Sequence, residues 1–130
     1  MSIVYVVGLG PGAGEQMTAQ ARQALEQCSV IAGYTVYIDL IREEFPEKQF
    51  LMTPMRKEAE RCKMALEQAQ QGQDVAMVCS GDAGVYGMAG LMYELKADYP
   101  GVDLKIVPGI TAATGGAAVL GAPLMHDFAV

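Results

Sequence analysis

Short apolar runs alternate along the chain with segments whose apolar residues recur every three or four positions. Most of the runs are uninterrupted by polar residues, which is typical of strands buried on both faces, as in a parallel sheet. The runs that we interpret as strands are residues 3–7, 29–32, 48–52, 75–79 and 104–107. Because the intervening segments have helical spacing, the sequence predicts an α/β domain with an open, mainly parallel five-stranded sheet and helices on both faces.

The clearest helix is predicted to follow the third strand, with Thr53 as its N-cap and Pro54 at its first position. Its charged residues, among them Glu58 and Arg61, are expected on an exposed face at helix-neighbour spacing. Gly72 is expected to end it. The apolar positions expected to be buried are Met55, Ala59, Cys62, Leu66 and Ala69.

The other predicted helices are shorter. Thr18 is expected to cap the first of them, and residues 36–42 form the second. Residues 85–95 carry a helical apolar stripe. Thr111 is expected to cap a last helix, made of small residues, that ends near Gly121.

The composition supports a single folded domain and narrows the choice of partners. The chain has 130 residues and a mass of 13.8 kDa, which suits one core. With 52% hydrophobic and 18% charged residues, it does not have the composition of a disordered chain. The formal net charge of −6 argues against a nucleic-acid partner and against an anionic membrane surface, since both need clustered Lys and Arg.

The compartment is predicted from three features. The positively charged start of an export signal is missing, because the first basic residue is Arg22. Residues 106–125 are uncharged, but their prolines, glycines and small side chains favour a turn and a closely packed helix in a soluble core over a membrane span. Cys28, Cys62 and Cys79 are odd in number and widely spaced, so neither a disulfide framework nor a metal site is predicted. We therefore expect a cytoplasmic protein with reduced thiols.

Three glycine-rich loops, residues 8–14, 80–84 and 108–111, each follow a predicted strand. In an open parallel sheet, ligands bind beyond the carboxyl ends of the strands, and glycine lets the backbone approach a ligand closely. Three such loops at one edge favour a ligand site there. The alternative is that these glycines are ordinary turn residues.

Two nucleotide-binding motifs do not fit well. Gly8, Gly10 and Ala13 match the G-x-G-x-x-A dinucleotide pattern formally. However, Pro11 and Gly12 interrupt the turn, and the second strand is followed by no acidic residue that could hold a ribose. A phosphate-binding Walker A loop is excluded because the chain contains no Gly-Lys pair.

Single residues near this edge leave alternatives open. Asp82, between two glycines, could cap the next helix or bind an ammonium or hydroxyl group of a ligand. Tyr34, Tyr37 and Asp39 lie in a segment that could reach the same edge. His126 is the only histidine, and a structural or exposed residue is a better interpretation of it than a catalyst.

The glycine loops carry motifs that are recognisable. Residues 6–12, 80–87 and 108–113 resemble the tetrapyrrole methylase family, in order and spacing. Residues 33–41 and 121–128 look like the branch that methylates C17 of precorrin-3B in cobalamin biosynthesis. The resemblance runs over the whole chain.

The resemblance implies a fold, a cofactor and a substrate. Members of the family use S-adenosylmethionine, bind it between two α/β domains, form homodimers and methylate a tetrapyrrole. In the C17 branch, methylation is coupled to contraction of the ring. By this resemblance, residues 1–121 are the amino-terminal methylase domain, and residues 122–130 begin the linker to a second domain that would supply part of the cofactor pocket.

The resemblance also implies roles for individual residues. Some relatives that methylate uroporphyrinogen carry a proposed Asp base where this chain has Tyr34, so no catalytic residue is assigned here, and no metal ligand. A polycarboxylate substrate needs basic groups, for which Arg42, Arg56 and Lys57 are candidates unless they are ordinary exposed charges. The residues expected to contact the cofactor are Pro11, Ser80, Gly81, Asp82, Val85, Thr111 and Ala112.

Other functions stay open at this point. They are another corrin-ring methylase, a diphthine-type methylase that modifies a protein side chain, and a non-catalytic nucleotide-binding module. A preference for adenosylhomocysteine over NAD separates the methylases from the module. With one wall of the cleft present, we expect the 130-residue chain to fold, bind the cofactor weakly, transfer no methyl group and self-associate through exposed apolar surface.

Overall fold

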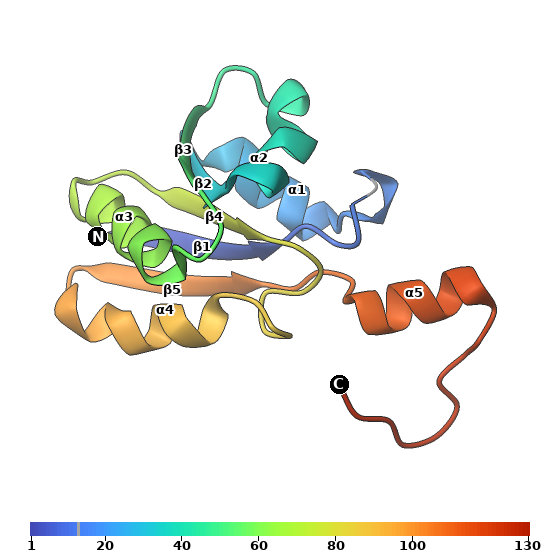
Figure 1. Ribbon diagram of the computed structural model, residues 1–130. Coiled ribbons are helices and arrows are strands. Elements are labelled where there is room, and N and C mark those ends of the chain that lie inside the picture. Colours follow the sequence, from blue (N-terminus) through green and yellow to red (C-terminus); the bar gives the residue numbers. More distant parts are fainter. Residues whose placement is uncertain (13) are drawn as a thin grey trace.

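The computed structural model describes residues 1–12 and 14–130; Ala13, part of the dinucleotide pattern considered above, lies outside the described residues. Five parallel strands form one sheet in the order β3-β2-β4-β1-β5 (Figure 1). The strands are β1 Ser2–Gly8, β2 Val30–Tyr34, β3 Gln49–Thr53, β4 Val75–Cys79 and β5 Val102–Val107. The predicted α/β fold class is therefore confirmed.

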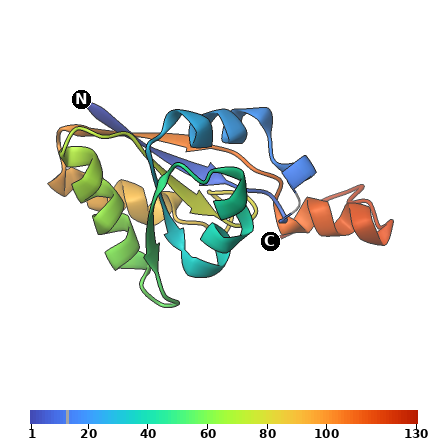
Figure 2. The same cartoon turned by 90° about the horizontal axis from the view of Figure 1, so that it is seen from above.

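Helices cover both faces of the sheet. Helices α1 and α2 pack on one face and α3 and α4 on the other, whereas α5 projects from the carboxyl edge (Figures 1 and 2). The helices are α1 Ala19–Gln27, α2 Thr35–Ile41, α3 Glu58–Gln70, α4 Ala89–Leu95 and α5 Ala112–Leu120. Single 3-10 turns are formed by η1 Gly14–Gln16, η2 Arg42–Glu44 and η3 Lys96–Asp98.

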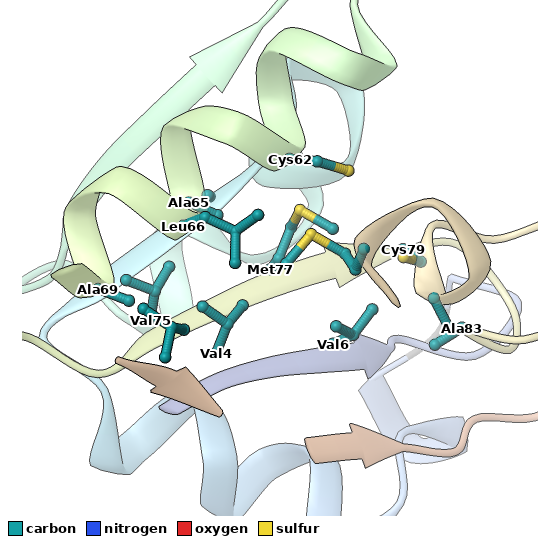
Figure 3. Packing of buried hydrophobic residues seen from close by; sticks show 14 of the residues in the cluster. Val4, Val6, Cys62, Ala65, Leu66, Ala69, Val75, Met77, Cys79 and Ala83 are labelled. Atoms are coloured by element: carbon teal, nitrogen blue, oxygen red, sulfur yellow. The ribbon is translucent and has the colours of Figure 1, made fainter. Parts of the chain in front are cut away.

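The central strands are buried on both faces, as their uninterrupted apolar sequences predict. On one face, Val4 of β1 and Met77 of β4 pack with Leu66 of α3 (Figure 3). On the other face, Val7 and Val78 belong to a second cluster, which contains residues of α1 and α2. Each large aliphatic side chain that is fully buried in this way contributes about 1.5–3 kcal/mol relative to exposure.

The predicted positions of three helix termini, the start of α1 and both ends of α5, are confirmed. The Thr18 hydroxyl accepts a hydrogen bond from the Ala21 N–H at 3.0 Å and so caps α1. Thr111 occupies the N-cap position of α5 with an extended backbone, but its side chain makes no capping bond. Gly121 ends that helix with a φ of +66°.

The predicted start of α3 is wrong. Thr53 still pairs with Tyr34 in the β2–β3 ladder, and Arg56 has a φ of +65°, so the chain becomes helical only at Glu58. Met55 is therefore exposed and outside the helix. Of the predicted buried stripe, Ala59 is also exposed, and the buried members are Cys62, Leu66 and Ala69.

The predicted exposed face of α3 is also partly wrong, because Arg61 is only 5% exposed. The later start of the helix leaves Thr53 and Pro54 in an extended segment, where they accept hydrogen bonds from the Arg61 guanidinium. Arg61, whose spacing in the sequence predicts an exposed side chain, therefore points into the protein interior.

Two further helices differ from expectation. Helix α4 starts at Ala89, so Val85 and Met88 precede it in the loop. Helix α5 does not pack into a core: Gly115 is its one buried residue among those described, and Val119 and Leu120 are 81% exposed. Among the residues that the structure describes, no helix is long and apolar enough to cross a membrane.

All three thiols are buried and unpaired. Burial raises the pKa of the Cys28 and Cys62 thiols to about 12 and that of the Cys79 thiol to about 11. These thiols are therefore protonated at neutral pH and behave as apolar packing groups.

The raised thiol pKa values predict a loss of stability at alkaline pH. Unfolded thiols titrate near the ordinary pKa of 9.0, so above about pH 9 the unfolded state loses protons that the folded state keeps. We expect the free energy of unfolding to fall as the pH rises from about 9 toward 12. Urea unfolding at several pH values measures this, and Cys62→Ala should flatten the dependence. An equal slope in the variant and the parent would contradict the assignment to the thiol.

Candidate functional site

The three glycine-rich loops meet at the carboxyl edge of the sheet, as predicted. Gly10 and Gly81 exchange backbone hydrogen bonds of 3.0 and 2.9 Å in an isolated antiparallel bridge. The Leu9 N–H donates to the Cys79 carbonyl at 2.8 Å. The loops after β1 and β4 are thus held together by main-chain bonds.

The meeting point is the topological switch of the sheet. Strands β1 and β4 are neighbours. The chain leaves β1 through α1 on one face and leaves β4 through α4 on the other face. In open α/β sheets a crevice forms where successive connections diverge in this way, and ligands bind there.

Two glycines are required by close contact between the loops. A Cβ on Gly8 would lie 2.5 Å from the Gly81 carbonyl oxygen and 2.9 Å from the Gly109 nitrogen. A Cβ on Gly109 would lie 2.7 Å from the Gly8 carbonyl oxygen and would also overlap the Gly81 carbonyl. Since all these neighbours are backbone atoms, no side chain can rotate away. Ordinary turn chemistry alone therefore does not explain these two glycines.

Asp82 joins the second loop to the third. One carboxylate oxygen accepts the Gly84 N–H and the other accepts the Gly109 N–H, both at 2.9 Å. The N-cap of α4 is Met88, so the alternative in which Asp82 caps the next helix is excluded. Its structural role is to fix two loops relative to each other.

Most of the predicted site residues share one groove of about 530 Å³, within the range of about 300–1,000 Å³ that small-molecule pockets occupy. Pro11 alone lies outside it, in an adjoining groove of about 360 Å³ that shares Ala112. The predicted residues that line the larger groove are Ser80, Gly81, Asp82, Val85, Thr111 and Ala112; its other lining residues are Tyr37, Tyr86, Ala113 and Val130.

The groove is suited to a small molecule with polar and apolar parts. Within the part of the chain that the structure describes, no side-chain hydrogen bond involves the Ser80 hydroxyl or the Thr111 hydroxyl. Val85 and Ala112 supply apolar surface. Tyr86 is 87% exposed and has a φ of +55°, so an aromatic ring stands at the mouth. No group of three or more His, Cys, Asp or Glu residues suited to a metal ion occurs among the described residues.

The other candidates are distributed differently. Tyr37 lines the groove, whereas Tyr34 lines a neighbouring cavity. Asp39 lies on the outside of α2, 3.8 Å from the Arg42 guanidinium. His126 is exposed and does not line the groove.

The basic residues that the sequence analysis proposed for substrate binding line neither the groove nor the neighbouring cavity. They are Arg42, Arg56 and Lys57. The Arg42 guanidinium contacts the Met52 sulfur at 2.7 Å, and Lys57 pairs with Glu60 at 3.5 Å. The cation that does line the neighbouring cavity is Arg61, which the sequence pattern assigned to an exposed face. No local signal could have revealed it, because its burial depends on the path of the strand-to-helix connection.

Comparison with known proteins agrees with the geometry. The sequence model for the family described as "Tetrapyrrole (Corrin/Porphyrin) Methylases" matches residues 3–130. The chain belongs to the tetrapyrrole methylase family. The resemblance seen in the glycine-loop motifs is thereby confirmed.

Individual tetrapyrrole methylases are similar over nearly the whole chain. A "Probable cobalt-factor III C(17)-methyltransferase" of Salmonella typhimurium is 46% identical over 127 residues, 97% of this chain and 53% of that protein. A "Cobalt-factor III methyltransferase" of Priestia megaterium is 44% identical over 129 residues, 95% of this chain and 24% of that protein. The crystal structure of the methyltransferase CobJ superposes with a TM-score of 0.89 at 40% identity, covering 99% of this chain and 55% of that one.

The chain therefore spans about half the length of the Salmonella protein and of CobJ, and a quarter of the Priestia protein. The groove at the carboxyl edge lies within the part that these proteins share with it.

Proposed function

We propose that this chain is the cofactor-binding domain of an S-adenosylmethionine-dependent methyltransferase that acts on a corrin precursor. The reaction would be C17 methylation of precorrin-3B or its cobalt form, coupled to ring contraction in cobalamin biosynthesis. The observation that carries the proposal is the shared groove: six motif residues line one space at the topological switch. The names of relatives at 44–46% identity support the substrate class.

The proposed domain boundaries are supported by the end of α5 at Gly121 and by the greater length of the relatives. We propose that residues 1–121 correspond to the first domain of these relatives and residues 122–130 to the start of the connection to their second domain. The groove then forms one wall of the cofactor cleft. We further propose a homodimer in the cytoplasm, a compartment in which three unpaired thiols stay reduced.

The roles of the groove residues follow from their chemistry. When bound, S-adenosylmethionine would supply a methyl group from its sulfonium to an electron-rich ring carbon, with adenosylhomocysteine as the leaving group. In this proposal the Ser80 and Thr111 hydroxyls, which line the groove, would hydrogen-bond its polar ends, and Val85 and Ala112 would contact its apolar surface. The protein's contribution is alignment and exclusion of water, which lower the barrier without an ionised nucleophile.

A titration with adenosylhomocysteine tests the proposal. We expect amide NMR signals of Gly81, Val85, Thr111 and Ala112 to shift, with NAD at the same concentration causing no such change. Because the groove contacts its ligand from one side, the 130-residue chain should bind more weakly than micromolar. Shifts confined to other residues, or an equal response to NAD, would refute the assignment.

A pair of threonine variants sharpens this test. The Thr111 side chain makes no capping bond, so Thr111→Val should leave stability nearly unchanged while weakening adenosylhomocysteine binding by about 0.5–1.5 kcal/mol. The matched control is Thr35→Val in α2, which removes a hydroxyl that donates to the Thr53 carbonyl at 3.3 Å and does not line the groove. This control should lower stability by about 0.5–1.5 kcal/mol without changing the affinity.

A further inference from the structure

A second cavity adjoins the groove and shares Tyr37, Ser80 and Tyr86 with it. It is bounded by the ends of β2 and β4, by α2 and by the start of α3, with Tyr34 and Arg61 in its lining. Its volume of about 230 Å³ is below the range of about 300–1,000 Å³ that holds a drug-sized molecule, so it fits a small group or one arm of a larger ligand.

Arg61 is the unusual residue of this cavity, here called the Arg61 cavity. Its Nε donates to the Thr53 hydroxyl at 2.6 Å, and one terminal nitrogen, Nη2, donates to the Pro54 carbonyl at 3.2 Å. The guanidinium carbon lies 5.6 Å from the centre of the Tyr34 ring. Within the residues that the structure describes, Arg61 takes part in no ion pair, and its other terminal nitrogen makes no hydrogen bond.

A buried guanidinium held only by neutral groups is costly, because arginine stays protonated and buried charges are normally paired. Glu58 also lines the cavity, but it is exposed and forms no ion pair with Arg61 in the described part of the chain. The nearby thiols carry no compensating charge, since burial raises the pKa of Cys62 to about 12 and that of Cys79 to about 11. The positive charge and the free donors of Arg61 are therefore available to a bound anion.

We propose that the Arg61 cavity is a carboxylate-binding subsite that anchors one acidic side arm of the substrate. This rests on the proposed function, in which the substrate is a polycarboxylate macrocycle. A planar guanidinium matches a carboxylate in shape and can donate two hydrogen bonds to it. The cation–π contact with Tyr34 and the hydrogen bond to Thr53 hold the guanidinium in place. Because the cavity and the groove share Ser80, an arm bound at Arg61 sets the position of the ring relative to the methyl donor.

The probe for this subsite is sodium propionate, which reproduces an acidic side arm of the substrate without the macrocycle. In the ¹⁵N-labelled chain, the Nε–H signal of Arg61 should shift as propionate is added at constant ionic strength. The neutral isostere propionamide should leave that signal unchanged. Equal shifts with propionamide, or no shift with propionate, would overturn the proposal, and this measurement needs no variant to fold.

Two variants of α3 extend the test. Arg61→Lys keeps the positive charge but loses the paired donors, so propionate should bind about tenfold more weakly. Lys63→Met removes a positive charge from an exposed position on the same helix and should leave the affinity unchanged. If both variants lost affinity equally, general electrostatic attraction and not the cavity would be responsible.

The methyl donor also carries a carboxylate. A final measurement therefore tests whether the Arg61 cavity binds the carboxylate of the substrate or that of the donor. With adenosylhomocysteine at saturation, propionate should still shift the Arg61 signal. Loss of that shift would assign the Arg61 cavity to the donor and overturn its assignment to the substrate. If adenosylhomocysteine failed to bind at all while propionate still shifted Arg61, the proposed cofactor would be wrong and the anion site would stand.

Discussion

Replacing Gly109 with alanine is expected to lower the free energy of unfolding by about 2–3 kcal/mol and to abolish adenosylhomocysteine binding. The new Cβ would lie 2.7 Å from the Gly8 carbonyl oxygen and would overlap the Gly81 carbonyl. All three loops of the groove would have to separate to admit one methyl group. Thermal or urea unfolding beside a calorimetric titration measures both effects.

The matched control is Gly90→Ala in α4, where an added Cβ meets no atom within 4 Å. Because alanine favours a helix over glycine, this variant should gain about 0.5–1 kcal/mol of stability and bind the ligand as the parent does. If Gly109→Ala were as stable as the parent and kept its affinity, the close packing of the loops would not be needed for the site.

Removing the Asp82 carboxylate is expected to lower stability and ligand affinity together. Asp82→Ala leaves the Gly84 and Gly109 N–H groups without their acceptors, which should cost about 1–3 kcal/mol of stability. Since the same carboxylate fixes two of the loops that line the groove, we expect adenosylhomocysteine binding to weaken as well. A melting curve and a calorimetric titration on the same sample give the two quantities.

Asp82→Asn tests whether the Asp82 carboxylate joins the two loops or only contacts the ligand. The amide keeps one acceptor oxygen and so should retain part of the stability and part of the affinity. A loss of affinity at unchanged stability in Asp82→Ala would mean that the carboxylate contacts only the ligand. That outcome would contradict the role of Asp82 in joining the loops.

The sequence by itself determined the architecture and the edge where the groove lies. Strands such as 75–79 are apolar at every position because both faces of a parallel sheet are covered, and this signal is local. The glycine loops follow directly from the strands, so their shared edge could be inferred from strand direction alone. The cofactor roles of Ser80, Gly81, Asp82 and Val85 came from the resemblance to the methylase family, whose motif here spans one of these loops.

The tertiary structure alone decided where helix α3 begins and which way Arg61 points. Thr53 suits an N-cap by residue type, but its pairing with Tyr34 keeps it in the sheet. The left-handed backbone at Arg56 then delays the helix to Glu58. Arg61 is therefore buried against Thr53 and Pro54, although its helical spacing resembles that of a solvated charge.

The contacts between the loops that shape the groove could not be predicted from the sequence pattern either. Asp82 accepts a hydrogen bond from Gly109, 27 residues away, and Gly8 tolerates no side chain because of the Gly81 carbonyl. Patterns of apolar and polar residues report which face of an element is buried, because burial repeats with the period of a helix or a strand. Contacts between loops have no such period, so they emerge only when the strands have brought the loops together.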